Sequence, residues 1–94
     1  MPNLAYNRGR ALEYRVMKHF RDQGFEVFRS AGSHSKVDVI AIKRYIKTAV
    51  LLIQCKTGKG LMTKKQREEF VKNGELLGCT SLLAYRIGRK LIIE

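Results

Sequence analysis

Nineteen lysine and arginine residues against eight aspartate and glutamate residues give this 94-residue chain a net charge of +11. Its hydrophobic residues amount to 45%, which excludes a disordered basic tail and predicts one small domain over residues 1–94. A charge of this size favours a polyanionic partner, most commonly nucleic acid, and no apolar run is long enough to cross a bilayer.

The N-terminal stretch MPNLAYNRGR lacks the apolar segment of a signal peptide, so we expect a cytoplasmic protein associated with DNA. The two cysteines, Cys55 and Cys79, do not have the spacing of metal ligands. In a reducing compartment they are expected to be free thiols that fill space, and no zinc site is predicted.

The first expected element is a helix over about residues 8–23, preceded by a loose lead-in over residues 1–7 with Asn7 or Gly9 near the helix start. Apolar residues recur at intervals of four, with Met17 beside them, namely Leu12, Val16 and Phe20. Gly24 fits the left-handed residue that ends a helix.

A short strand over residues 25–30 follows, and after it comes a loop of small residues, AGSHS. Two apolar runs, VDVIAI over 37–42 and AVLLIQCK over 49–56, are joined by the basic tip KRYIKT. Neither run alternates cleanly, so both are predicted to be central and largely buried strands.

A second helix is predicted over residues 64–77, with Thr63 as a candidate N-cap but without an acid where a capping box would need one. Its apolar members are Phe70, Val71, Leu76 and Leu77. Strands over 80–87 and 90–94 close the chain around a Gly88-Arg89 turn. The order α-β-β-β-α-β-β predicts an α/β fold with a mixed central sheet of about five strands flanked by helices.

Three polar residues interrupt the apolar hairpin, and charged or amide groups are rarely buried without partners. They are Asp38, Gln54 and Lys56. Gln54 and Lys56 are two apart, so on a regular strand they project from the same face. An acid, an amide oxygen and an amine at strand ends can hold a divalent cation beside a phosphate.

The motifs of this chain resemble those of archaeal-type Holliday junction resolvases, within the PD-(D/E)xK nuclease superfamily. The resemblance includes Glu13 in GRALEYRV, the stretch GFEVFRSAGSHSKVD that leads to Asp38, the QCK tripeptide, and the final LIIE. It covers nearly the whole chain. It implies a restriction-endonuclease-like fold and a metal-dependent endonuclease that cuts four-way DNA junctions in recombination and repair.

The resemblance also implies roles for the motif residues. Phosphodiester hydrolysis needs a nucleophilic water and neutralisation of charge on the phosphate, and Mg²⁺ prefers oxygen ligands. Asp38 and Glu13 would be carboxylate ligands of Mg²⁺ or Mn²⁺, joined by the Gln54 carbonyl and the backbone oxygen of Cys55. Lys56 would orient the attacking water, so Glu13, Asp38, Gln54 and Lys56 form the predicted catalytic set.

The chain departs from the superfamily pattern at two positions. Val37 stands where a proline often precedes the aspartate, and Gln54 stands where the motif has a glutamate. The second change removes a formal charge, and a neutral amide is a weaker ligand for a hard cation. Nucleases that resemble the Mrr-type restriction enzymes carry a similar QxK.

Each candidate has a plainer interpretation as well. Asp38 could be a solvated strand end, Glu13 an ion-pair partner of Arg10 or Lys18, and Lys56 an edge lysine. His34 could be a general base, although we favour a phosphate contact or an exposed bystander. The predicted DNA-contacting residues are Arg8, Arg10, Arg29, Ser33, His34, Ser35, Lys36, Lys59, Lys64 and Lys65.

We therefore expect an endonuclease acting on branched DNA as a homodimer, because a four-way junction must be cut in two symmetric strands. Phe70 and Val71 are candidates for the dimer interface. A restriction- or repair-type nuclease acting on duplex DNA, or a DNA-binding protein without catalytic activity in which Gln54 marks a decayed site, are the alternatives.

Overall fold

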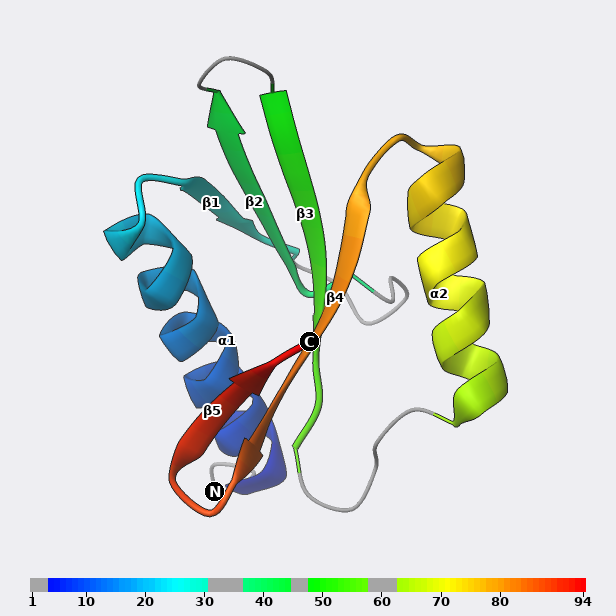
Figure 1. Ribbon diagram of the computed structural model, residues 1–94. Coiled ribbons are helices and arrows are strands. Elements are labelled where there is room, and N and C mark those ends of the chain that lie inside the picture. The colour runs from blue at the N-terminus through cyan, green and yellow to red at the C-terminus, as the bar shows by residue number, and fades with distance from the viewer. Residues whose placement is uncertain (1–3, 31–36, 45–47, 58–62) are drawn as a thin grey trace.

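The computed structural model describes residues 4–30, 37–44, 48–57 and 63–94, and within these ranges the predicted order of elements is confirmed (Figure 1). The elements are α1 (Leu4–Asp22), β1 (Glu26–Arg29), β2 (Val39–Arg44), β3 (Thr48–Cys55), α2 (Lys64–Leu76), β4 (Thr80–Ile87) and β5 (Lys90–Ile93). No helix of the described residues is long and apolar enough to cross a membrane.

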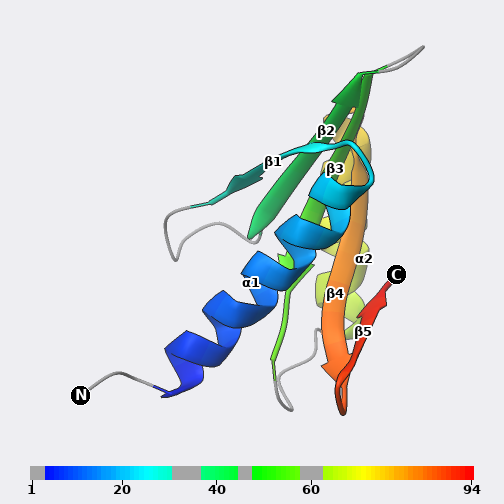
Figure 2. The same ribbon diagram turned by 90° about the vertical axis from the view of Figure 1, so that its left-hand side faces the viewer.

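The strands form one mixed sheet in the order β1-β2-β3-β4-β5. Neighbours are antiparallel except β3 and β4, which run parallel and are connected through α2. A parallel pair needs such a crossover, because a tight turn cannot return the chain to the same direction. The helices α1 and α2 lie on opposite faces of this sheet (Figures 1 and 2).

The core lies between α1 and the sheet. The predicted apolar face of α1 is confirmed, with Leu12, Val16, Met17 and Phe20 all buried. They pack against side chains of the central strands, namely Val39, Ala41, Ile53 and Ala84. This packing fixes α1 across β1 to β3 and thereby sets the position of every polar side chain on the helix.

The predicted start of α1 is wrong, because the helix begins at Leu4 and includes residues expected in a loose lead-in. Gly9 lies inside the helix, where glycine costs about 1 kcal/mol relative to alanine, and its helix-forming neighbours offset this. The end is as predicted: Gly24 has φ 92°, in the left-handed region.

The two central strands are less buried than predicted. In β2, fully buried Val39 and Ala41 alternate with partly buried residues, and on β1 Phe28 is 54% exposed. The reason is the placement of α2, which packs against β4 and leaves the neighbouring part of its face open. The apolar runs therefore have one face under α1 and one less covered face.

The apolar face of α2 is also narrower than predicted. Only Phe70 and Gly74 are buried, whereas Leu76 and Leu77 are more than 70% exposed and Val71 is partly exposed. Phe70 therefore belongs to the protomer core and cannot serve in a dimer interface. The helix does begin with a capping box, formed between Thr63 and the amide of Gln66 instead of an acid.

Candidate active site

Asp38 lies immediately before β2, where the regular pairing with β3 ends. Its backbone N–H donates to the Ile53 carbonyl at 2.8 Å, and its own carbonyl accepts from the Ser30 N–H at 2.9 Å. Its carboxylate Oδ2 accepts from the Cys55 N–H at 2.7 Å. The Asp38 side chain thus takes the place of a backbone acceptor for the N–H of Cys55, the last residue of β3. This hydrogen bond holds the carboxylate beside the QCK segment.

Taken together, the surroundings of Asp38 raise the pKa of its carboxyl group above the ordinary value. Burial raises the pKa of this carboxyl above its ordinary value, and the nearby Glu13 raises it further. The Cys55 N–H, Lys56 and Arg29 act in the opposite direction and lower the pKa. Glu13, Arg29 and Lys56 are therefore all close enough to Asp38 to influence its charge.

Glu13 lies on α1 and is held by Arg29 of β1. The Arg29 Nε donates to Glu13 Oε2 at 2.5 Å, and both side chains are more than three-quarters buried. The plainer interpretation of Glu13 as an ion-pair partner is thus observed, but with Arg29, while Lys18 pairs with Asp22. Arg29, predicted only as a DNA contact, is brought to the carboxylates.

Gln54 and Lys56 come from the end of β3. Gln54 is buried, and its Oε1 has no hydrogen-bond donor among the residues that the structure describes. Lys56 is partly buried, and its backbone N–H donates to the Ala84 carbonyl at 2.9 Å, which continues the pairing with β4. Strand alternation places the Gln54 and Lys56 side chains on one side.

A divalent cation is compatible with these groups. Mg²⁺ is usually bound through one or two carboxylates, with water and substrate phosphate completing its ligands. Asp38 and Glu13 could supply carboxylates, and Gln54 Oε1, which has no donor among the described residues, is a buried acceptor available to a cation. The described residues contain no group of three or more His, Cys, Asp and Glu side chains that could hold a metal by themselves.

The burial and raised pKa of the Cys55 thiol indicate a structural role for this side chain. Burial, followed by the charges of Asp38 and Glu13, raises its pKa far above the ordinary value. The thiol is therefore neutral and unreactive at neutral pH, and it packs against the core. Both cysteines are free.

Tyr14 was not identified from the sequence. Its ring is half exposed, and the guanidinium groups of Arg10 and Arg29 lie 5.8 and 5.7 Å from the ring centroid. Arg10 also contacts the Tyr14 hydroxyl at 3.4 Å. The i, i+4 spacing of Arg10 and Tyr14 was a usable signal. The contact between Arg29 and Tyr14 has no such sequence signal, because it depends on how α1 crosses β1.

The other predicted DNA contacts divide into two groups. Lys64 and Lys65 are exposed in the first turn of α2. The remaining predictions cannot be placed: the side chain of Arg8 is not described, and the other residues lie outside the described ranges, namely Ser33, His34, Ser35, Lys36 and Lys59.

Comparison with known proteins gives a consistent result. The model of the family described as archaeal Holliday junction resolvase (Hjc) matches residues 4–93. The crossover junction endodeoxyribonuclease Hjc of Methanocaldococcus jannaschii is 31% identical over 90 residues, which cover 93% of this chain and 65% of that protein. The chain thus spans about two-thirds of the length of this curated relative.

A solved structure shows the same fold. The Holliday junction resolvase Hjc of Archaeoglobus fulgidus superimposes with a TM-score of 0.69 at 21% identity, and the match covers 92% of this chain and 70% of that protein. This likeness confirms the predicted restriction-endonuclease-like α/β fold.

Proposed function

Because this chain belongs to the archaeal Holliday junction resolvase family, we propose that it is a metal-dependent endonuclease that cleaves phosphodiester bonds in four-way DNA junctions. The observation that carries the proposal is the family match over residues 4–93. The contact between Asp38 and the QCK segment supports it, because it gathers the motif residues at the junction of β2 and β3.

The proposed chemistry assigns a task to each group. Asp38, Glu13 and the Gln54 carbonyl would hold the cation, together with the backbone oxygen of Cys55. A bound Mg²⁺ would neutralise charge on the phosphate and lower the pKa of bound water. Lys56 would orient the attacking water and offset negative charge as the phosphorus–oxygen bond breaks. Arg29 keeps Glu13 in position beside Asp38.

Binding would depend on the dispersed cations. Arg10, beside Tyr14, presents positive charge near the proposed cleavage site, whereas Arg29 is paired with Glu13. Lys64 and Lys65 lie at the N-terminus of α2, where unpaired N–H groups and the helix dipole already favour an anion. These groups would contact phosphates and not base edges, so we expect little sequence preference.

We also propose that the active form is a homodimer. Val71, Leu76 and Leu77 leave apolar surface exposed on α2, and a second copy would cover it. Two copies related by a two-fold axis would supply the two symmetric cuts that a junction needs. Sedimentation at micromolar concentration should give the mass of two subunits, and a monomer that still cleaves would favour the duplex-nuclease alternative.

The decisive experiment compares labelled four-way, duplex and single-stranded DNA, with Mg²⁺, with Mn²⁺ and with chelator. We expect metal-dependent cleavage of the four-way junction. Asp38→Asn and Lys56→Ala should each reduce the cleavage rate by about 10²-fold or more, while gel-shift affinity for the junction stays close to that of the parent.

The alternatives give different results in the same assay. Preferential cleavage of plain duplex would identify a restriction- or repair-type enzyme. Junction binding without cleavage in any metal would identify a DNA-binding protein with a decayed site. Full activity in both variants would remove Asp38 and Lys56 from the mechanism.

A further inference from the structure

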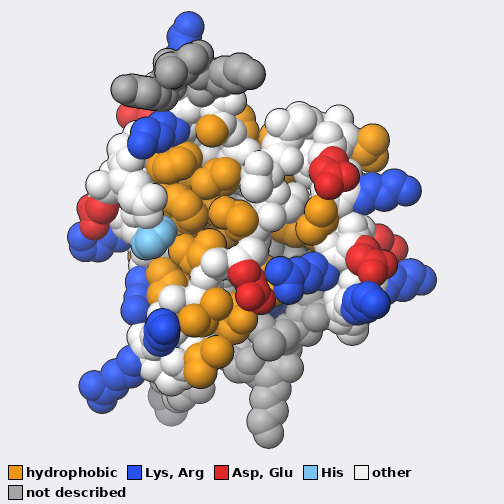
Figure 3. Space-filling model, viewed as in Figure 1, with side chains coloured by type: hydrophobic (Ala, Val, Ile, Leu, Met, Phe, Trp, Pro, Cys, Tyr) orange, Lys and Arg blue, Asp and Glu red, His pale blue; other side chains and the backbone are white. Residues whose placement is uncertain are grey.

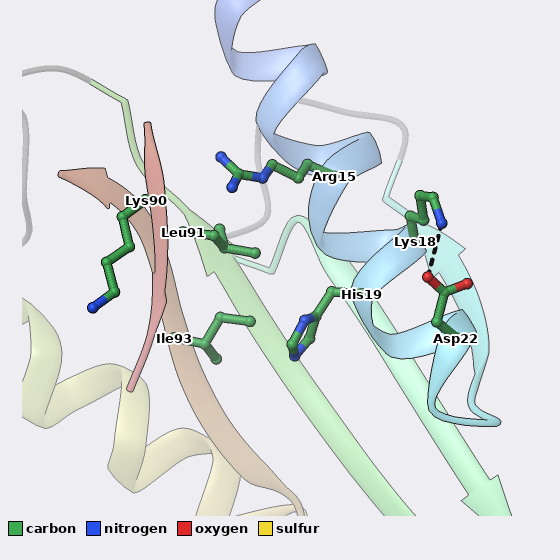
Figure 4. A pocket seen from close by; sticks show the side chains of 7 residues that line it. All are labelled: Arg15, Lys18, His19, Asp22, Lys90, Leu91 and Ile93. Carbon is green, nitrogen blue, oxygen red and sulfur yellow. Dashed lines mark hydrogen bonds and ion pairs between the residues drawn. The ribbon is translucent and has the colours of Figure 1, made fainter. Parts of the chain in front are cut away.

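A groove separate from the proposed nuclease residues runs between α1 and β5 (Figure 4). Its volume is about 650 Å³, and it is lined by four residues of α1 and three of β5: Arg15, Lys18, His19, Asp22, Lys90, Leu91 and Ile93. In the space-filling view, hydrophobic side chains gather on this face between α1 and the last strands (Figure 3). The groove therefore has an apolar floor beside a polar helix.

The floor consists of Leu91 and Ile93, which are only partly buried and pack against the edge of the core. Figure 4 shows both side chains directed from β5 toward α1, with Ile93 facing His19 and Leu91 facing Arg15. Lys90 also lines the groove, and its side chain extends away from α1 in the same view. An occupant of the groove would thus contact two aliphatic side chains on one side and Arg15 and His19 on the other.

The backbone of β5 offers hydrogen bonds at the same place. Among the strands that the structure describes, β5 pairs with β4 alone and forms an edge of the sheet. Leu83 and Glu94 exchange both backbone hydrogen bonds, at 2.8 and 2.9 Å, and so form a hydrogen-bonded pair. Leu91 and Ile93 belong to the non-hydrogen-bonded pairs of the same ladder. Because bonded and non-bonded pairs alternate in an antiparallel ladder, the N–H and C=O groups of Leu91 and Ile93 point to the open edge.

The charge of the groove is positive. Lys18 and Asp22 form an ion pair at 2.8 Å and neutralise each other. Arg15 has no ion-pair partner among the described residues, so its charge is available to an occupant. His19 is exposed and shares a hydrogen bond of 2.7 Å with Gln23. A carboxylate beside Arg15 would form a charge-assisted hydrogen bond.

We propose that this groove binds an extended segment of a partner protein that combines acidic and aliphatic residues, added as a further strand along β5. Strand addition would satisfy the outward backbone groups of Leu91 and Ile93, and alternate side chains of the segment would face α1. An aliphatic side chain would cover Ile93, and an acidic one would pair with Arg15.

Two other occupants fit less well. A second copy of this chain paired through the same edge would bring two Arg15 side chains to one groove, where like charges repel. DNA would complement Arg15, but it has no groups that extend a β-ladder and nothing aliphatic enough to cover Leu91 and Ile93. The charge and the open backbone together select an acidic peptide strand.

The test uses a short fluorescein-labelled peptide in which threonine alternates with glutamate or valine, with fluorescence polarisation as the readout. A peptide with lysine in place of glutamate, and one with an N-methylated backbone, are the matched controls. We expect saturable binding of the acidic peptide, and loss of binding with either control. Equal binding of the N-methylated peptide would overturn the proposed strand addition.

Protein variants locate the site. Arg15→Glu should weaken acidic-peptide binding by about tenfold or more, whereas Lys72→Glu, the same charge change on α2, should have little effect. Leu91→Pro removes an outward N–H without touching the β4 ladder and should abolish binding, with circular dichroism as the check on folding.

Equal weakening by Arg15→Glu and Lys72→Glu would overturn the proposal, because the attraction would then be general. If Leu91→Pro converts a dimer to a monomer, the groove binds a second copy. If Arg15→Glu weakens binding of four-way DNA and no peptide binds, the groove belongs to the DNA surface. Either result would show that the groove has an occupant other than an acidic peptide and would overturn the proposal.

Discussion

Asp38 occupies a position where its ionised form is unfavourable to the fold. Burial raises its pKa, although the Cys55 N–H and two nearby cations partly compensate. A group that binds a cation must nevertheless be ionised when the cation arrives. The proposed active site is thus expected to lower stability in the absence of metal, as is common where function needs a desolvated charge.

This leads to a prediction about pH. A carboxyl with a raised pKa holds its proton more tightly in the folded state, so its ionisation lowers the free energy of unfolding as pH rises from the ordinary value of 3.8 through the raised one. Asp38→Asn cannot ionise, and its amide oxygen can still accept from the Cys55 N–H. We expect Asp38→Asn to be more stable than the parent at neutral pH.

Urea unfolding at a series of pH values measures this difference. The gap should close below about pH 4, where Asp38 is protonated in both states of the parent. Asp22→Asn, a change at an exposed carboxylate of α1, is the control. If Asp38→Asn is less stable than the parent at neutral pH, the carboxylate makes stronger native interactions than the described contacts indicate.

Gln54 carries a second prediction at the residue scale. Its Oε1 is buried and has no donor among the described residues, so Gln54→Glu should add charge at the same place and lower the Mg²⁺ concentration for half-maximal cleavage. Gln54→Leu should reduce activity or require far more metal. It should also keep the free energy of unfolding or raise it by about 1 kcal/mol, because an unsatisfied buried acceptor is removed.

Metal titrations of cleavage and urea unfolding of the same three proteins provide the test. Identical metal dependence in all three would mean that Gln54 does not face the cation. Cleavage that appears only in Gln54→Glu would instead support the decayed-site alternative.

The sequence singled out individual candidate residues but not the contacts between them. Asp38, Gln54 and Lys56 stand out because they interrupt apolar runs, and the motif resemblance added Glu13. Their proposed roles remain predictions. The ion pair between Glu13 and Arg29 was not predicted, because the two are 16 residues apart and meet only through the packing of α1 on β1.

At the scale of elements, the order of helices and strands was predicted correctly, while boundaries and faces were less accurate. The helix α2 illustrates why. Its apolar residues suggested a wide buried face, yet the contact with β4 is made by Phe70 and Gly74. Close approach of a backbone at a glycine leaves no periodic signal, so the apolar pattern did not show that Leu76 and Leu77 would be exposed.

The contact between α2 and β4 gives a third prediction. A Cβ added at Gly74 would collide with Ser81 Oγ, which itself donates to the Phe70 carbonyl at 3.1 Å. Gly74→Ala should therefore destabilise the protein by about 1–3 kcal/mol, despite the better helix propensity of alanine.

A double-mutant cycle separates the collision from other effects. Ser81→Ala removes the hydroxyl, so Gly74→Ala should be less harmful in that background, as measured by urea unfolding. Gly78→Ala, at a glycine with φ 71° and open space around it, is a control for backbone strain without collision. Additive effects of Gly74→Ala and Ser81→Ala would show that α2 shifts to relieve the contact.

At the scale of the whole molecule, the predicted family and fold are confirmed by the family match and the solved resolvase structure. What the sequence did not predict is how unevenly the two helices cover the sheet. The apolar runs of β2 and β3 indicated burial, but the described part of the chain has two helices to cover two faces. Exposed apolar surface remains on β1 and on α2.

Net charge gives the last prediction, because it acts over the whole surface. With a net charge of +11, binding to a four-way junction should release many counterions from the DNA. The association constant should then fall by about 10³-fold or more between about 50 and 200 mM salt. The slope of log affinity against log salt measures how many phosphates are neutralised. Lys64→Ala and Lys65→Ala together should make that slope shallower while leaving the ranking of DNA substrates unchanged, since phosphate contacts carry no sequence information. A slope that is shallow in the parent protein would mean that few phosphates are contacted, and the binding surface proposed for DNA would have to be abandoned.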